Sequence, residues 1–160
     1  MAGSERDLLR MDEQEVVTFL EAGRRAQVST NGPDGWPHVV PMSYVVLDGD
    51  VVLWTDGVSR KVRNLRCDDR MTCLVEKGDT VAEFRAVQIR GTAEIVDDYD
   101  RSLETGRALF SRYRGGPLDS QTEDYVRSLA HQRVAVRLHA KGVVSWDHRK
   151  MAVDVRTIGS

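Results

Sequence analysis

The chain has 160 residues, of which 41% are hydrophobic and 30% are charged, and its formal net charge at pH 7 is −2. This length suits one domain with a buried core, so we expect a single domain over residues 1–160 with a core of about residues 12–151 and loose termini. The near-neutral charge excludes the basic field of most nucleic-acid-binding proteins, and the lack of about 18 consecutive apolar residues excludes a membrane-spanning helix.

The N-terminal residues and the cysteines indicate a compartment. Residues 1–15 (MAGSERDLLRMDEQE) contain no apolar signal segment, which argues against export. Cys67 and Cys73 have no metal-ligand residues at a suitable spacing. Both observations favour a reduced protein in the cytoplasm, without a nucleic-acid or membrane partner.

The first part of the chain predicts a helix, a short strand and a turn. Asp12 and Glu15 form a capping box at the start of the helix, and Gly23 ends it. The short strand covers residues 26–30, and the turn sequence Asn-Gly-Pro-Asp-Gly follows at residues 31–35.

The next segment is the most informative one. Residues 39–47 are nearly all apolar, and a second buried strand covers residues 51–55. The dipeptide Asp48-Gly49 between them predicts a hairpin turn, because glycine tolerates the positive φ that such turns need. A helix with a basic start follows from Ser59 to about residue 69.

The remaining elements complete a mainly β pattern. Gly91 lies within a long alternating stretch and predicts a bend or bulge, which closing a barrel often requires. Six or seven strands with a few helices favour a small β-barrel with helical decorations. The expected strands are residues 71–77, 81–96, 134–138 and 140–146, and the expected helices are residues 98–113 and 122–131.

The helix start at Ser59 has the features of a phosphate-binding site. A serine at this position can cap free backbone amides, and these amides and the helix dipole attract anions. Arg60 and Lys61 add two positive charges, and arginine can bind a phosphate through two parallel hydrogen bonds. The alternative is a basic helix surface exposed to solvent, because most charge clusters are only that.

Other catalytic or metal sites lack support in the sequence. His38, His131, His139 and His148 have none of the spacings typical of zinc ligands. No serine lies in the glycine frame of a nucleophile elbow, and no GxGxxG fingerprint joins a strand to a helix. We therefore predict no metal site and assign no catalytic side chain.

Three segments resemble a known family. They are residues 35–41 (GWPHVVP), 51–65 (VVLWTDGVSRKVRNL) and 142–147 (GVVSWD). They resemble the pyridoxamine 5'-phosphate oxidase-like split-barrel superfamily, which binds FMN or coenzyme F-420, and most of all its actinobacterial flavin/deazaflavin oxidoreductase branch. The resemblance covers roughly residues 12–151. It implies a six- to seven-stranded split β-barrel of the FMN-binding type and a homodimer with the cofactor at the interface.

The resemblance also assigns cofactor-binding residues. It places Arg60 and Lys61 on the phosphate, with Ser59 and Asn64 flanking that site. It places one strand along the flavin ring, largely through its backbone. For Trp54 the alternative is a position in the core, because a tryptophan in a strand is more often a core residue. The residues assigned on strands are His38, Val39, Val40, Pro41, Met42, Ser43, Trp54 and Thr55.

The resemblance implies an oxidoreductase in which the cofactor supplies the chemistry. We expect reduced coenzyme F-420 to donate a hydride to a small conjugated, quinone-like or tetrapyrrole-like acceptor. FMN is the alternative cofactor. A further alternative is a non-catalytic cofactor-binding or haem-binding protein of the same fold, with His38 or His148 as axial ligand. Residues 145–149 (SWDHR) differ from the substrate-binding end of vitamin B6 oxidases, which argues against oxidation of pyridoxamine phosphate.

Overall fold

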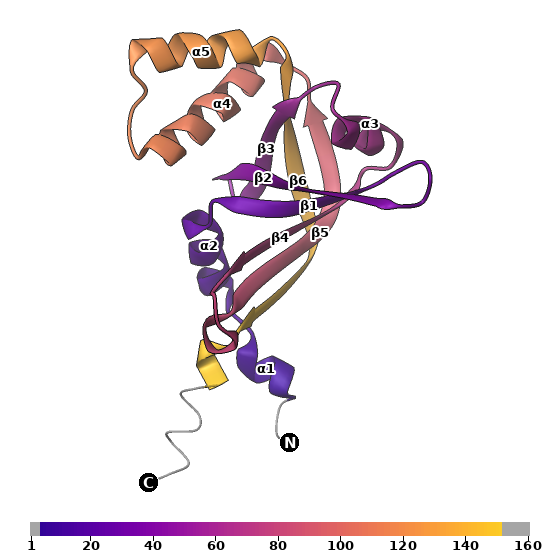
Figure 1. The fold of residues 1–160 in the computed structure, drawn as a ribbon, viewed down its shortest axis with the longest axis vertical. Helices are drawn as coiled ribbons and strands as arrows, with labels where there is room; N and C mark the ends of the chain where they lie inside the picture. Colours follow the sequence, from indigo (N-terminus) through magenta and orange to yellow (C-terminus); the bar gives the residue numbers. More distant parts are fainter. Residues whose placement is uncertain (1–3, 152–160) are drawn as a thin grey trace.

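The computed structural model describes residues 4–151, and its centre is a closed barrel of six antiparallel strands (Figure 1). The order around the barrel is β1-β2-β3-β6-β5-β4. This confirms the prediction of a mainly β barrel with helical decorations. The strands are β1 (Arg25–Asn31), β2 (Pro37–Leu47), β3 (Asp50–Asp56), β4 (Arg70–Lys77), β5 (Arg85–Val96) and β6 (Arg133–Asp147).

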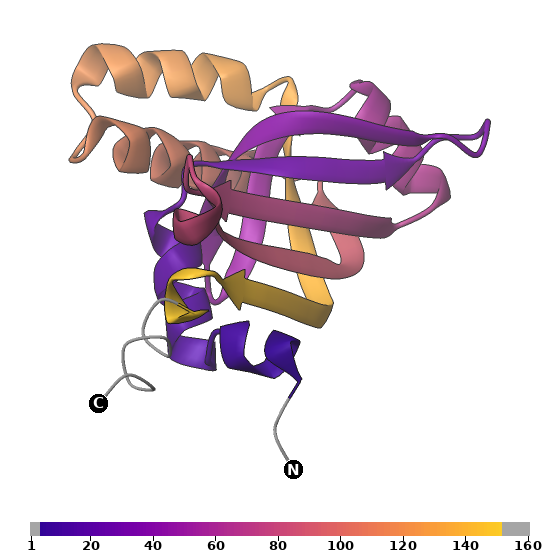
Figure 2. The ribbon, with the colours of Figure 1, turned by 60° about the horizontal axis from the view of Figure 1, so that its bottom comes forward.

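The helices surround this barrel. Figure 1 shows α4 and α5 as a helical hairpin on one side of it, and Figure 2 shows α2 across the ends of several strands. Within the described residues, no helix has the length and apolar character needed to cross a bilayer. The α-helices are α1 (Glu5–Leu9), α2 (Glu13–Ala22), α3 (Arg60–Cys67), α4 (Tyr99–Arg114) and α5 (Ser120–Ala130), and a 3₁₀ turn covers Val81–Glu83.

Two apolar clusters stabilise the fold. The larger one fills the barrel and includes Tyr44, Leu53 and Val136, each 0% exposed. The smaller one lies between the outer face of the barrel and the α4–α5 hairpin, where Val45 of β2 is buried. The apolar residues of β2 therefore pack on both faces of the strand, because α4 covers part of its outer face.

Several local features form as the sequence predicts. Asp48 and Gly49 both have positive φ, 52° and 84°, in the turn between β2 and β3. The capping box at α2 is formed, with Asp12 Oδ1 accepting from the amide of Glu15 at 2.8 Å and Glu15 Oε2 accepting from the amide of Asp12 at 2.7 Å. Gly23 follows the last residue of α2, and a Cβ at this position would collide with Tyr44.

Two expected boundaries were wrong, and one helix was missed. Residues 134–138 and 140–146 form one continuous strand, β6, whose register against β5 shifts between Arg90 and Gly91. The shift leaves Lys141 as an extra residue, so the alternation breaks while the strand continues. The start of the predicted strand 81–96 is a 3₁₀ turn, and β5 begins only at Arg85. Helix α1 was not predicted, because its five residues bury no side chain.

Candidate functional site

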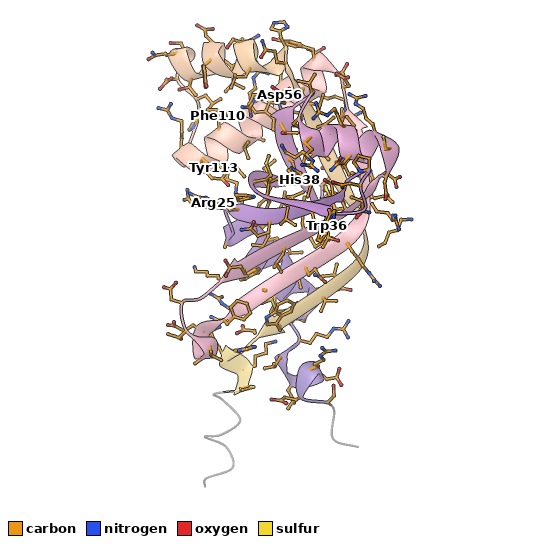
Figure 3. All side chains as sticks on the ribbon, turned by 45° about the vertical axis from the view of Figure 1, so that its right-hand side comes forward. Arg25, Trp36, His38, Asp56, Phe110 and Tyr113 are labelled. Atoms are coloured by element: carbon orange, nitrogen blue, oxygen red, sulfur yellow. The ribbon has the colours of Figure 1, made fainter. Side chains whose placement is uncertain are left out.

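β2 and β3 separate beyond a short paired segment, and this opening is the split of the barrel. They pair only where residues 44–47 of β2 face residues 50–53 of β3. From Ser43 back to Pro37, β2 pairs with β1 alone, and from Trp54 to Asp56, β3 pairs with β6 alone. One edge of β2 therefore has no strand partner among the described residues, and its backbone N–H and C=O groups are free for a ligand. Figure 3 labels His38 and Asp56 on the two separating strands.

A tight turn connects the end of β3 to α3. Asp56 organises it, because its carboxylate accepts a hydrogen bond from the amide of Val58 at 2.8 Å and its carbonyl accepts one from the amide of Ser59 at 3.2 Å. The turn places the N-terminus of α3 beside the end of the split.

The first amides of α3 have no partner. Among the described residues, none accepts a hydrogen bond from the backbone amides of Arg60, Lys61 or Val62. Ser59 occupies the N-cap position, but its hydroxyl makes no capping hydrogen bond. Its Oγ is instead buried without a partner among the described residues. The expected serine cap is thus not formed, and both the hydroxyl and the amides are left for another acceptor. Such a donor set fits a phosphate group.

The two cations of the first turn have different surroundings. Nη2 of Arg60 lies 3.8 Å from Oδ2 of Asp34, which belongs to the loop between β1 and β2, and both side chains are about half exposed. Burial lowers the pKa of Lys61 below its ordinary value; the carboxylate of Asp56 opposes this shift and the guanidinium of Arg133 adds to it. A phosphate beside Lys61 would stabilise its charged form.

Asn64 anchors the helix instead of facing the split. Its side-chain amide donates to Oγ1 of Thr30 at 3.0 Å, and the two residues are 4% and 1% exposed. Asn64 therefore holds α3 against β1 and fixes the position of the first turn of the helix.

The free segment of β2 presents two sets of side chains. His38, Val40 and Met42 pair with residues of β1 that are buried in the barrel. The alternate residues, Val39, Pro41 and Ser43, therefore point to the outer face. The structure thus brings this segment and residues 59–61 to the same split, and their part in cofactor binding stays a prediction.

Trp54 and Thr55 lie on the part of β3 that pairs with β6 but not with β2, and their side chains are not open to the split. Trp54 is 1% exposed, its Nε1 donates to Oγ of Ser102 at 2.8 Å, and its ring meets that of Phe110 edge-on at 6.1 Å. Thr55 is 4% exposed. The indole of Trp54 is therefore a core side chain. Only the backbone of Trp54 and Thr55 lies where it could contact a cofactor.

Comparison with known proteins agrees with this geometry. A family model described as pyridoxamine 5'-phosphate oxidase matches residues 12–147. The chain belongs to this family. No curated protein matches the chain significantly.

Solved structures show the same fold. A conserved hypothetical protein from Mycobacterium tuberculosis is 37% identical, with a TM-score of 0.87 over 94% of this chain and 93% of that one. An F-420 reductase is 24% identical, with a TM-score of 0.60 over 79% and 93% of the two chains. The heme storage protein HutZ from Vibrio cholerae is 18% identical, with a TM-score of 0.65 over 86% and 97%.

In this member of the pyridoxamine 5'-phosphate oxidase family, two site neighbours were missed from the sequence. Asp34 contacts Arg60, and Arg133 lies over the ring of Trp54 at 4.8 Å and near Lys61. Arg133 comes to the site because β6 pairs with β3, and Asp34 comes to it from the loop between β1 and β2, so no local pattern marks either residue. Within residues 4–151, no group of three or more His, Cys, Asp or Glu side chains is arranged to hold a metal ion.

Proposed function

We propose that this protein is an oxidoreductase that binds coenzyme F-420 in the split and reduces a small conjugated, quinone-like or tetrapyrrole-like acceptor. The observation that carries the proposal is the set of unpartnered donors at the start of α3, which comprises three backbone amides and the buried hydroxyl of Ser59. Arg60 and Lys61 add positive charge to the same turn. This set suits the phosphate of a cofactor whose ring extends along the free edge of β2.

The residues of the chain bind and orient, and the cofactor supplies the redox chemistry. When bound, the reduced deazaflavin supplies a hydride, and the acceptor completes its two-electron reduction by taking a proton from solvent. The free backbone of β2 fixes the ring plane through hydrogen bonds, while Asp56 and Asn64 hold the phosphate-binding turn in place. No side chain of the site is needed to transfer a proton.

Coenzyme F-420 is preferred over FMN for three reasons. One F-420 reductase has the same fold, and the family branch that the sequence resembles uses this cofactor. The split also offers one phosphate-binding turn and one open strand edge, which suits a cofactor that exchanges between enzymes. FMN would present a phosphate to the same turn and is the competing cofactor.

We infer a homodimer in which a second copy covers the split. Three apolar side chains border the split and are exposed, Trp36 at 74%, Val39 at 55% and Val58 at 75%. Large exposed apolar side chains grouped around a binding site are typical of a protein interface. Sedimentation equilibrium should give about twice the 18.0 kDa mass of the chain. A monomer that still binds the cofactor fully would contradict a shared site.

Turnover with a labelled donor tests the proposed reaction. Reduced F-420 carrying deuterium at its transferable position is mixed with the protein and a conjugated enone such as cyclohex-2-enone. We expect deuterium on the β-carbon of the saturated ketone, where it does not exchange with water, and the return of the absorbance of oxidised F-420 near roughly 420 nm. A protein that purifies with stoichiometric FMN and leaves reduced F-420 unchanged would establish the FMN alternative.

Haem binding is the second candidate. It is favoured by the shared fold with a heme storage protein and by His38, a half-buried residue whose ring has no hydrogen-bond partner among the described residues. His148, in contrast, contacts the carbonyl of Val81 at 2.8 Å. Titration with hemin tests it: an intense Soret band that His38→Ala removes and His148→Ala retains would support it, and no such band would exclude it.

A further inference from the structure

A half-open cavity lies at the end of the barrel opposite the split. It has a volume of about 520 Å³ and is lined by residues of α2 and of the ends of β4, β5 and β6. Figure 2 shows α2 across the ends of the strands, and Figure 1 shows α2 and α3 well apart. Phe19, Val75 and Met11 form an apolar wall, each less than one-tenth exposed. The proposed cofactor site uses none of these residues.

Arg85 lines this cavity and has no ion pair among the described residues. Its guanidinium carbon lies 5.6 Å from the centre of the Phe19 ring. Its Nε is buried and has no hydrogen-bond partner among the described residues. Leaving a charged donor buried and unpaired costs free energy, and an anionic acceptor removes that cost.

The nearest carboxylate does not serve as this acceptor. Asp147 lies opposite Arg85 in the β5–β6 pairing, but its Oδ2 is bound by Nη2 of Arg149 at 2.6 Å. Burial alone would raise the pKa of Asp147, but the hydrogen bonds from Arg149, and the charges of Arg149 and Arg85, outweigh it and hold the pKa below its ordinary value. Asp147 is therefore ionised and already satisfied by another residue.

The remaining charges also favour an anion. Glu15 is bound by Lys150 at 2.7 Å, so it is neutralised in the same way as Asp147. The lining residues without an ion pair among the described residues are Arg24, Lys77, Arg85 and Glu76. Three cations face one anion, which gives the cavity a positive potential.

We propose that this cavity binds a small organic monocarboxylate, with its carboxylate on Arg85 and its apolar ring or chain against Phe19 and Val75. One half-buried guanidinium beside an aromatic ring suits a single carboxylate attached to an apolar body. The volume lies within the range of small-molecule sites, about 300–1,000 Å³. The site is separate from the split, so its occupation does not depend on the cofactor.

Titration with cinnamate and with the neutral cinnamyl alcohol tests the proposal. Binding is followed by calorimetry and by the amide NMR spectrum of the full chain. We expect cinnamate to bind about tenfold or more tightly than the alcohol, because only the acid forms a charge-assisted bond with Arg85. The amide signals that shift should be those of Phe19, Ala22, Gly23 and Val75. Equal affinity for the two compounds, or shifts confined to the split, would overturn the proposal.

Two variants locate the site, and two controls accompany them. Arg85→Met should weaken cinnamate about tenfold or more, and Ala22→Trp should block the cavity from the exposed face of α2 without touching the barrel interior. Arg90→Met, on the exposed side of β5, and Lys61→Ala, at the split, should leave cinnamate affinity unchanged. If Arg85→Met fails to fold, Ala22→Trp decides. Unchanged affinity in a folded Ala22→Trp or Arg85→Met variant would overturn the proposal.

Discussion

The side-chain amide of Asn64 donates a 3.0 Å hydrogen bond to the hydroxyl of Thr30, and both side chains are buried. Asn64 lies on α3 and Thr30 on β1, so the bond joins the helix to the barrel wall. Val62 and Leu65 of the same helix belong to the barrel core, at 0% and 4% exposed. The position of the turn that begins α3 is therefore set by the core.

Removing one partner of this bond should destabilise the protein. Asn64→Ala leaves the Thr30 hydroxyl buried without its donor, and we expect a loss of about 1–3 kcal/mol in the free energy of unfolding. In a Thr30→Val, Asn64→Ala double variant, the loss should be smaller than the sum of the single losses. Urea unfolding measures all three. Additive losses would show that the two side chains are not coupled.

Gly106 of α4 should resist the usual stabilising change to alanine. Alanine in a helix interior is normally better than glycine by up to about 1 kcal/mol. Here a Cβ would lie 2.7 Å from Cζ2 of the Trp54 ring. We expect Gly106→Ala to cost about 1–3 kcal/mol through overpacking. Gly116→Ala, where a Cβ meets open space, is the matched control. A rise in the melting temperature of Gly106→Ala would contradict the packing described here.

Alkaline pH should destabilise the fold through two buried acids. Burial raises the pKa of Tyr44 to about 12, with Arg112 opposing, and burial raises the pKa of Cys73 to about 12. The folded protein holds these protons more tightly than the unfolded chain, whose ordinary values are 10.0 and 9.0. Their contribution is therefore complete below pH about 9 and is lost as pH rises towards about 12.

Unfolding by urea at a series of pH values measures this loss. Cys73→Ala should flatten the decline between pH about 9 and 12, because one of the two acids is removed. Cys67→Ala, at an exposed position, is the control and should leave the slope unchanged. The same slope in wild type and Cys73→Ala would refute the assignment to Cys73.

Local chemistry explains which features the sequence could predict. The Asp48-Gly49 turn and the Asp12–Glu15 capping box depend on residues adjacent in the chain, and both form as expected. The division of β6 failed because the extra residue Lys141 interrupts the alternation without ending the strand. Long-range contacts left no local signal.

The candidate site shows the same limit. Ser59 was expected to cap α3, and only the folded structure reveals that its hydroxyl has no partner. Asn64 was expected beside the ligand, but its amide is bonded to Thr30, a residue brought near by the barrel. Arg133 lies near Lys61 because β3 and β6 pair, although 72 residues separate them in the numbering.

Ser59→Ala should affect stability and binding differently. Replacing an N-cap serine normally costs about 1 kcal/mol, but this hydroxyl makes no capping bond. We expect the unfolding free energy of the ligand-free protein to be unchanged or higher, because a buried unpaired hydroxyl is removed. Cofactor affinity should fall, by about 0.5–1.5 kcal/mol, for the lost hydrogen bond. Loss of stability without loss of affinity would show that Ser59 has a structural role only.

The most direct test is a calorimetric titration of F-420 into wild type, Lys61→Arg and Lys61→Ala across the pH range from neutral to alkaline. The pKa of Lys61 is lowered by burial, so wild-type affinity should fall as pH rises, starting below the ordinary range of a lysine, because the ammonium loses its charge. Lys61→Arg should stay flat, since arginine remains charged. Lys61→Ala should bind more weakly by about 1–3 kcal/mol at neutral pH, and Arg127→Ala, on α5, should match wild type. Wild-type affinity in Lys61→Ala at every pH would contradict phosphate binding at the start of α3.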